Sequence, residues 1–184
     1  MKKHIITACL YTGITSVLLG LVYPLVITGI ARAAFRDKAD GQLVVRDGEV
    51  IGSKLIGQPF TGPGYFHSRP SAAGSGYDAS ASSGSNLAPT SKALVDRVKA
   101  SVTAEEGVGA VPVDLVTASG SGLDPDISPA AALYQVSRVA QERKLPEETV
   151  RQLVTQQIKP RQFGLLGEPT VNVLALNLAL EQTR

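Results

Sequence analysis

The sequence predicts an α+β protein, with one N-terminal transmembrane helix followed by a single small mixed α/β domain. No charged side chain occurs from Ile5 to Ala31, a stretch of 27 residues. The remaining chain combines short strand-like runs with amphipathic helical segments. These segments do not alternate in the βαβ order of a dinucleotide-binding fold. We therefore expect a membrane anchor at residues 1–34 and one globular domain at residues 35–184.

The uncharged run is long enough for a membrane-spanning helix. At about 1.5 Å per residue it spans about 40 Å, whereas the hydrocarbon core is about 30 Å thick. A cleaved signal peptide is the alternative, because Lys2, Lys3 and the triplet Ala31-Arg32-Ala33 resemble its two ends. The apolar region of a signal peptide, however, has only about 7–15 residues. Basic residues flank both ends of the run, so the charges do not fix its orientation.

The predicted helix carries a ridge of small or helix-bending residues at intervals of four. Small residues let a second helix approach closely, and neighbours in a membrane can satisfy the carbonyl that a proline leaves free. The alternative is that glycine and proline are simply common in membrane helices. We predict that the ridge contacts a partner helix. Its members are Thr12, Ser16, Gly20, Pro24 and Thr28.

The domain begins with a hairpin signal and a long irregular segment. Residues 43–52 are two apolar runs around Asp47-Gly48, which predicts a hairpin with a primed turn. Residues 57–91 are rich in Gly, Ser, Ala and Pro, a composition typical of linkers. Aromatic residues interrupt this segment, so we expect a packed irregular loop instead.

The rest of the domain is predicted to be mainly helical. Ser128 is a good N-cap, with Pro129 at the first helical position. Glu147 and Glu148 suit the positive end of the next helix. The predicted elements are a helix at 91–102, a buried strand at 113–119, helices at 129–144 and 147–158, and a last helix at 171–182 whose first residues also fit a strand.

Two loops share the pattern S-G-S-x-L-x-P, at residues 83–89 and 119–125, which lie 36 residues apart. Each precedes a predicted helix, where free N–H groups favour anions. No phosphate-binding lysine motif is present, and Asp124 would repel phosphate. The loops are therefore either helix-entry turns or contacts to a nucleotide or partner. We expect positive φ at Gly120 and Gly122. The candidate residues are Ser83, Gly84, Ser85, Asn86, Ser119, Gly120, Ser121, Gly122 and Asp124.

Composition argues against several classes of function. The net charge of +2 and the absence of tryptophan speak against nucleic-acid binding. One cysteine and two histidines predict neither an internal disulfide nor a metal site. There is no G-x-S-x-G elbow and no metalloprotease motif. An anchored or secreted serine hydrolase remains an alternative because of the serine-rich loops. A third interpretation has Asp124 and Asp126 weakly attracting ions.

Five ordered motifs resemble a known family over nearly the whole chain. The family is the C subunit of the bacterial Kdp-type potassium-transporting P-type ATPase. The motifs are GSKLIGQPF at 52–60, YFHSRPSAAG at 65–74, SGSNLAPTS at 83–91, VTASGSGLDPDISPAAA at 116–132 and GLLGEPTVNVLALNLAL at 164–180.

The resemblance implies an accessory subunit of an inner-membrane potassium import pump. Its expected partners are a channel-like potassium-translocating subunit, an ATP-hydrolysing subunit and the lipid membrane. The resemblance places the amino terminus in the cytoplasm and the domain outside it. It also implies a catalytic chaperone that raises the apparent ATP affinity, with ATP and potassium belonging to the complex and no cofactor bound directly. Because an outer domain does not meet cytoplasmic ATP, we expect this effect to pass through assembly.

Overall fold

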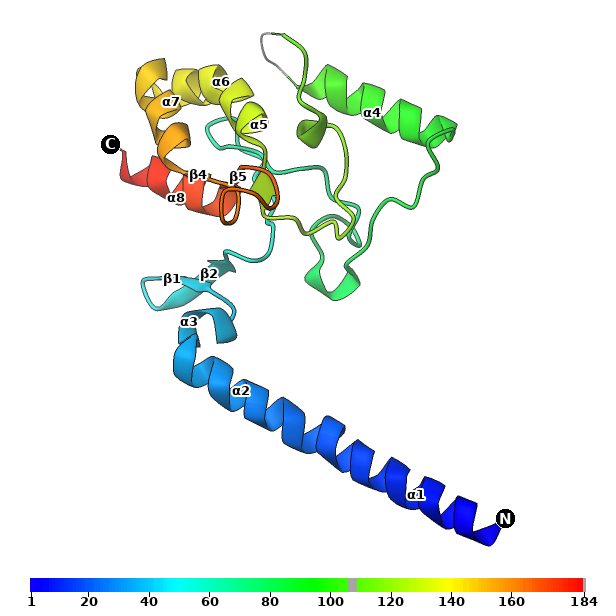
Figure 1. Ribbon diagram of the computed structural model, residues 1–184. Helices are drawn as coiled ribbons and strands as arrows, with labels where there is room; N and C mark the ends of the chain where they lie inside the picture. The colour runs from blue at the N-terminus through cyan, green and yellow to red at the C-terminus, as the bar shows by residue number, and fades with distance from the viewer. Residues whose placement is uncertain (106–108, 184) are drawn as a thin grey trace. The chain divides into compact units, whose positions relative to one another are not determined.

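The structure, a computed structural model, describes residues 1–105 and 109–183. The chain forms two compact units, Met1–Val50 and Ile51–Arg184, and each is described by itself (Figure 1). The predicted boundary after residue 34 marks where the chain leaves the membrane, and this boundary stays a prediction.

The first unit begins with one continuous helix, Lys2–Ala34, of 33 residues. It consists of α1 (Lys2–Val17), the π-helical turn η1 (Leu18–Val22) and α2 (Tyr23–Ala34). Among the described residues it is the one helix long and apolar enough to cross a membrane. This confirms the predicted long apolar helix, whose length and composition suit a membrane span. The wide turn comes directly before Pro24, whose ring would crowd the carbonyl of a regular preceding turn.

After the long helix come the short helix α3 (Arg36–Ala39) and the strands β1 (Leu43–Arg46) and β2 (Glu49–Ser53), which pair as a hairpin. The turn residues Asp47 and Gly48 have φ of 52° and 84°. Positive φ at both central positions is the signature of a type I′ turn, so the predicted primed hairpin is confirmed.

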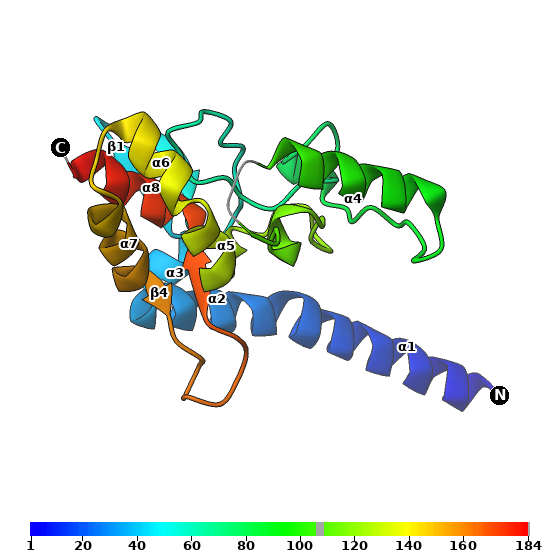
Figure 2. The ribbon, with the colours of Figure 1, turned by 90° about the horizontal axis from the view of Figure 1, so that it is seen from above.

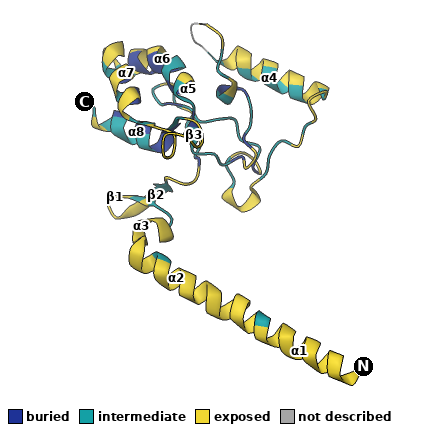
Figure 3. Ribbon diagram, viewed as in Figure 1, coloured by how far each residue is buried: buried dark blue, intermediate teal, exposed yellow. Residues whose placement is uncertain are grey.

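The second unit is built on a small antiparallel sheet with strand order β3-β5-β4. The strands are β3 (Asp126–Ile127), β4 (Ile158–Lys159) and β5 (Thr170–Asn172). Val171 on the central strand pairs with Ile127 on one side and Ile158 on the other. This sheet lies beside a group of four helices, which supplies most of the buried residues (Figure 3).

The four helices agree with the predicted ones, with three adjustments, one of which is that the predicted 147–158 helix ends at Gln156 and Ile158 belongs to β4. They are α5 (Pro129–Tyr134), α6 (Val136–Arg143), α7 (Glu147–Gln156) and α8 (Val173–Gln182). The predicted 129–144 helix is divided at Gln135, and the first residues of the predicted 171–182 helix belong to β5. Ser128 is the N-cap, since its hydroxyl accepts a hydrogen bond from the Ala131 amide. The apolar core includes Phe66, Ile127, Val136, Val139, Val150, Val154, Val171, Leu176 and Leu180.

The predicted strand at 113–119 is wrong. Residues Val113–Leu115 form a short 3-10 helix, η3, in which Leu115 is buried, and the following residue Val116 is buried as well. A short apolar run reports burial but not backbone conformation, and here Pro112 starts a turn rather than a strand.

The irregular segment 57–91 is packed, as predicted. Phe66 and Ala73 in this segment have no exposed surface. The segment contains one short 3-10 helix, η2 (Ala79–Ala81), and then leads into α4 (Lys92–Ala104). The α4 helix confirms the predicted helix at 91–102, yet none of its residues is buried. It lies apart from α5–α8 in both views (Figure 1 and Figure 2).

Candidate functional site

The fold places the two S-G-S loops against each other. The backbone amide of Ser83 donates a 3.0 Å hydrogen bond to the carbonyl of Ser121. The hydroxyl of Ser82 donates to the same carbonyl, also at 3.0 Å. One copy of the motif is therefore bonded to the other through their backbones, and we call this arrangement the loop pair (residues 82–89 and 119–125).

Gly122 is the most crowded position of the loop pair. Its φ is +67°, and a Cβ there would lie 2.6 Å from the carbonyl oxygen of Ser83 and 2.7 Å from the amide nitrogen of Ala73. Both neighbours are backbone atoms, which cannot rotate away as a flexible side chain would. The predicted positive φ at Gly122 is confirmed, and the position requires glycine for two separate reasons.

The prediction of positive φ at Gly120 is wrong. Gly120 is absent from the glycines with positive φ, and a Cβ there would meet no atom within 4 Å. The close approach occurs at Gly84 instead, where a Cβ would lie 3.0 Å from the Gly120 carbonyl oxygen. The second S-G-S copy bends at its fourth residue rather than its second, because the amide of Gly122 turns back to the carbonyl of Ser119.

Neighbouring segments satisfy the polar groups of the second copy. Arg69 pairs with the carboxylate of Asp124 at 3.2 Å, and its guanidinium also lies 3.5 Å from the carbonyl oxygens of Thr117 and Ala118. Ser71 donates a 2.6 Å hydrogen bond to the Gly122 carbonyl. The basic side chain that reaches this loop is thus already paired with an acid.

Two buried amide side chains fix the course of the segment that carries Arg69. Asn177 on α8 accepts from the Phe66 amide and donates to the Phe66 carbonyl, at 2.9 and 3.0 Å. Gln135, between α5 and α6, does the same for His67, at 2.7 and 3.1 Å. Each amide side chain reproduces the hydrogen bonds that a neighbouring strand would supply, so a segment without a strand partner is held in the core.

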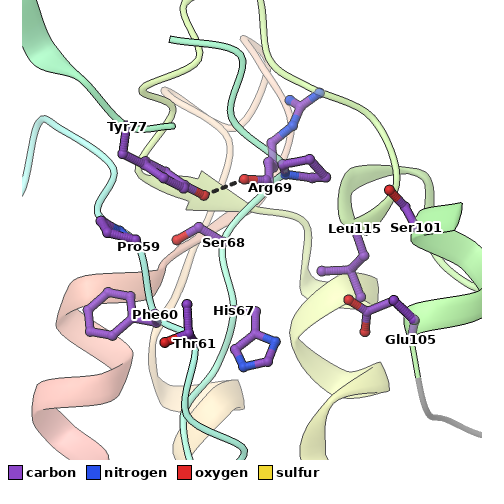
Figure 4. Close-up of a pocket in the computed structure, with 12 residues that line it drawn as sticks. Pro59, Phe60, Thr61, His67, Ser68, Arg69, Tyr77, Ser101, Glu105 and Leu115 are labelled. Carbon is purple, nitrogen blue, oxygen red and sulfur yellow. Dashed lines mark hydrogen bonds between the residues drawn. The ribbon is translucent and has the colours of Figure 1, made fainter. Parts of the chain in front are cut away.

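An open pocket of about 410 Å³ lies between this segment and the end of α4. Figure 4 shows the rings of His67 and Tyr77 and the carboxylate of Glu105 around it, whereas the guanidinium of Arg69 points away from them. The Tyr77 hydroxyl donates to the Arg69 carbonyl. Pro59, Phe60 and Leu115 supply apolar walls.

Burial shifts the pKa values of the titratable groups in this pocket. Desolvation, and next the positive charge of Arg138, lower the pKa of His67, which its hydrogen bond to the Gly62 carbonyl partly opposes. Burial also raises the pKa of Glu105 and that of Tyr77. Each shift favours the uncharged form of its group.

The remaining candidate residues of the loop pair have different environments. Ser119 is buried, Ser85 is partly buried, and Asn86 and Ser121 are exposed. The Ser121 hydroxyl accepts a hydrogen bond from the Leu123 amide, and Asn86 has φ of 52°. Ser121 and Asn86 thus serve the turns of the loops themselves. Whether the loop pair contacts a nucleotide or a partner stays a prediction.

The predicted helix ridge lies wholly in the first unit. Each of its five residues is exposed on the long helix, as expected for side chains awaiting a partner or lipid. The π-helical turn between Ser16 and Pro24 alters the angular spacing along the ridge. Whether the ridge contacts another helix stays a prediction.

Sequence reasoning missed the residues that hold the segments next to the loop pair. Ser71 bonds to the Gly122 carbonyl of the loop pair, whereas Gln135 and Asn177 bond to the backbone of His67 and Phe66. None of the three lies in the S-G-S motif. A signal for two of them was present, because Gln135 and Asn177 are amide residues inside otherwise apolar helical faces. A polar residue at such a position must find a partner when it is buried.

The arrangement defines a class of protein: one long apolar helix that is able to span a membrane, followed by one small α+β domain. Comparison with known proteins identifies the family. Residues 5–182 match the family model described as KdpC, the c chain of the K+-transporting ATPase. The chain belongs to this family.

Close relatives carry the same name. The chain is 63% identical over 181 residues to the "Potassium-transporting ATPase KdpC subunit" of Acidobacterium capsulatum, covering 98% of each chain. It is 59% identical over 187 residues to the protein of that name from Koribacter versatilis, covering 100% of this chain and 97% of the relative. The chain is thus a KdpC subunit of a potassium-transporting ATPase, which confirms the resemblance of its motifs.

Proposed function

We propose that this chain is a non-catalytic assembly subunit of a high-affinity potassium import pump. Its long helix would span the inner membrane, with the amino terminus in the cytoplasm and the second unit outside. It would hold a channel-like potassium-translocating subunit and an ATP-hydrolysing subunit in a productive complex. The observation that carries this proposal is the self-satisfied loop pair, whose hydrogen-bonding groups serve the domain rather than a substrate.

The proposed effect on ATP follows from assembly. A subunit that stabilises the ATP-competent state of a complex raises the apparent ATP affinity without touching the nucleotide. The loop pair supports this route, because Arg69 is paired with Asp124 and the Ser83 amide is bonded to Ser121. In this account the chain acts as a catalytic chaperone through the stability of the complex.

The serine-hydrolase alternative gains no support from the site. Catalysis of that kind needs a base within hydrogen-bond reach of the nucleophile. His67 is the histidine of the second unit, and its ring Nε2 contacts the Gly62 carbonyl at 3.1 Å. We therefore retain the assembly role as the one proposed function.

Purification of the intact complex tests the proposal. A tagged copy of this chain, expressed with its neighbouring subunits, should bring down two larger membrane subunits with potassium-stimulated ATPase activity. Removing the chain should reduce the yield of the complex and raise the ATP concentration needed for half-maximal hydrolysis. Recovery of the chain alone, with the remaining subunits fully active and tightly ATP-binding, would contradict the assembly role.

Orientation is tested separately with a single surface cysteine. Ala79 is exposed in the second unit, and Cys9 lies within the long helix. In a Cys9→Ser background, Ala79→Cys should react with a membrane-impermeant thiol reagent in intact spheroplasts. Labelling that appears only after lysis would reverse the proposed topology.

A further inference from the structure

The connection between β4 and β5, residues 160–169, presents large apolar side chains to solvent. Phe163 is 84% exposed, Leu165 80% and Leu166 59%. The first two are the most exposed large apolar side chains among the described residues of the second unit. Apolar groups gathered at one tip cost free energy in water unless something covers them.

The apolar side chains are carried by a hydrogen-bonded hairpin turn at residues 162–166, which we call the tip. The Gln162 amide donates to the Leu166 carbonyl and the Leu166 amide returns the bond, both at 2.9 Å. Phe163 and Gly164 have φ of 54° and 74°, and they turn the chain at its apex. Below the turn, Arg161 pairs with Glu168 at 2.5 Å. The turn therefore holds the apolar side chains in place before they contact anything, so that less conformational entropy is lost on binding.

The tip emerges beside the point where the segment from the anchor reaches the domain. The Asn172 side chain, on β5, donates a 3.0 Å hydrogen bond to the carbonyl of Lys54. β5 starts at Thr170, directly after the 160–169 connection. Both features thus lie at one end of the second unit.

The length of the connecting chain lets this end reach the membrane. The long helix ends at Ala34 and the second unit starts at Ile51, so 16 residues (35–50) separate them. Sixteen residues reach at most about 55 Å when fully extended, and a hairpin within them shortens that span. The end of the domain that carries the tip therefore stays within chain reach of the bilayer surface.

The chemistry of the tip suits lipid headgroups. Lys54, Lys159 and Arg161 flank it, and the last two are 58% and 42% exposed despite their ion pairs. Their partners are Asp126 and Glu168, and Glu168 is 75% exposed, so the flanks carry both signs of charge. Exposed apolar side chains with long basic side chains beside them are typical of segments that rest in the membrane interface. A stable protein interface, in contrast, buries about 1,200–2,000 Å² in total, more than three side chains supply.

We propose that the 160–169 hairpin inserts Phe163, Leu165 and Leu166 into the interfacial layer of the bilayer, as a second contact besides the helix. This inference rests on the proposed function only for the membrane anchoring of the chain. The contact would orient the domain relative to the membrane and restrict its swing about the 35–50 segment. Such restriction would lower the entropic cost of docking in the pump.

A depth-sensitive fluorescent label tests the proposal on the full chain. In a Cys9→Ser background, Leu165→Cys is labelled with an environment-sensitive fluorophore and the chain, without other subunits, is reconstituted in phosphatidylethanolamine–phosphatidylglycerol vesicles. Val113→Cys is the matched control, because Val113 is apolar and 65% exposed in the same unit. We expect a blue-shifted emission at residue 165, with loss of most of its fluorescence when headgroup-region nitroxide lipids are included. Residue 113 should show neither change.

Further variants separate the alternatives. Phe163→Asp with Leu166→Asp should return the label at residue 165 to a solvent-like spectrum, while the melting temperature of the domain is unchanged. A solvent-like spectrum at residue 165 in the original vesicles would overturn the proposal. If that label became shielded only in the assembled complex, the tip would instead dock on a protein subunit. Co-purification of the unlabelled chain with the pump reports independently on the proposed function.

Discussion

The two S-G-S loops share five of seven residues but have different surroundings in the domain. Their fourth residues, Asn86 and Gly122, both have positive φ, 52° and 67°. Asn86 is exposed, whereas Gly122 is buried against backbone atoms. The two loops therefore bend at the same position of the motif, and the space around that position decides which residue fits there. Asparagine tolerates positive φ in the open, but only glycine fits in the crowded copy.

The sixth residues of the motif separate the copies further. Asp124 pairs with Arg69 and accepts a hydrogen bond from the Asp126 amide, whereas its counterpart Ala88 is exposed. The second copy leads through β3 into the buried helix α5, and the first leads into α4, which has no buried residue. One copy of the motif thus precedes a helix with no buried residue, and the other precedes a helix that contributes to the core.

The largest expected effect comes from Gly122→Ala. The added Cβ meets backbone at 2.6 and 2.7 Å and must also adopt positive φ. Overpacking costs about 1–3 kcal/mol and left-handed backbone about 1–2 kcal/mol, so the free energy of unfolding should fall by about 2–4 kcal/mol. Urea denaturation of the full chain in detergent measures it. Asn86→Ala, at the matched position of the first copy, has the φ cost alone and should lose less. Equal losses at the two positions would break the comparison.

A smaller effect is expected from Gly84→Ala. Its Cβ would lie 3.0 Å from the Gly120 carbonyl oxygen, but Gly84 is not among the residues with positive φ. A small shift of the exposed Gly120 relieves the contact, and alanine lowers the entropy of the unfolded chain. We expect a loss of about 1 kcal/mol or less in the same urea experiment. A loss as large as that of Gly122→Ala would mean that the loop pair is equally tight on both sides.

Asp124→Asn sharpens the comparison at the sixth position. The ion pair with Arg69 is lost, while the amide oxygen still accepts from Asp126. Because both side chains are partly exposed, at 25% and 32%, the unfolding free energy should fall by only about 0.5–1 kcal/mol. The difference should shrink at high salt. Ala88→Asp is the control and should change little, and a salt-independent loss for Asp124→Asn would exclude an electrostatic origin.

The smallest effect concerns His67, in the pocket between the Arg69 segment and α4. Burial lowers the pKa of His67 in the folded chain below its ordinary value of 6.5. The unfolded chain therefore binds a proton first as the pH falls, and stability present above pH 6.5 declines below it. Stability curves at several pH values should show this decline between neutral pH and the lowered pKa of His67. His67→Gln should flatten the curve in that window, and an unchanged slope would contradict the assignment.

Much of the fold was predictable because the local signals were strong. Three local signals each predict their structure: the 27-residue uncharged run, the Asp47-Gly48 turn and the Ser128-Pro129 cap. The strand predicted at 113–119 failed because burial alone does not specify conformation. The contact between the two S-G-S loops also lay beyond local reading. Local reading also does not show that Gln135 and Asn177 hold the 66–67 backbone, from 68 and 111 residues away.

The ATP dependence of the assembled pump tests the central claim, that the loop pair supports the domain and does not contact nucleotide. The variants are Ser119→Ala with Ser121→Ala, compared with Gly122→Ala, at matched subunit stoichiometry. The account predicts that the serine variant hydrolyses ATP with an unchanged half-saturating concentration, because the Ser121 hydroxyl bonds within its own turn and the Ser119 side chain is buried in the domain. Gly122→Ala should lower activity through reduced assembly. A several-fold rise in the half-saturating ATP concentration for the serine variant, in a fully assembled complex, would contradict the account.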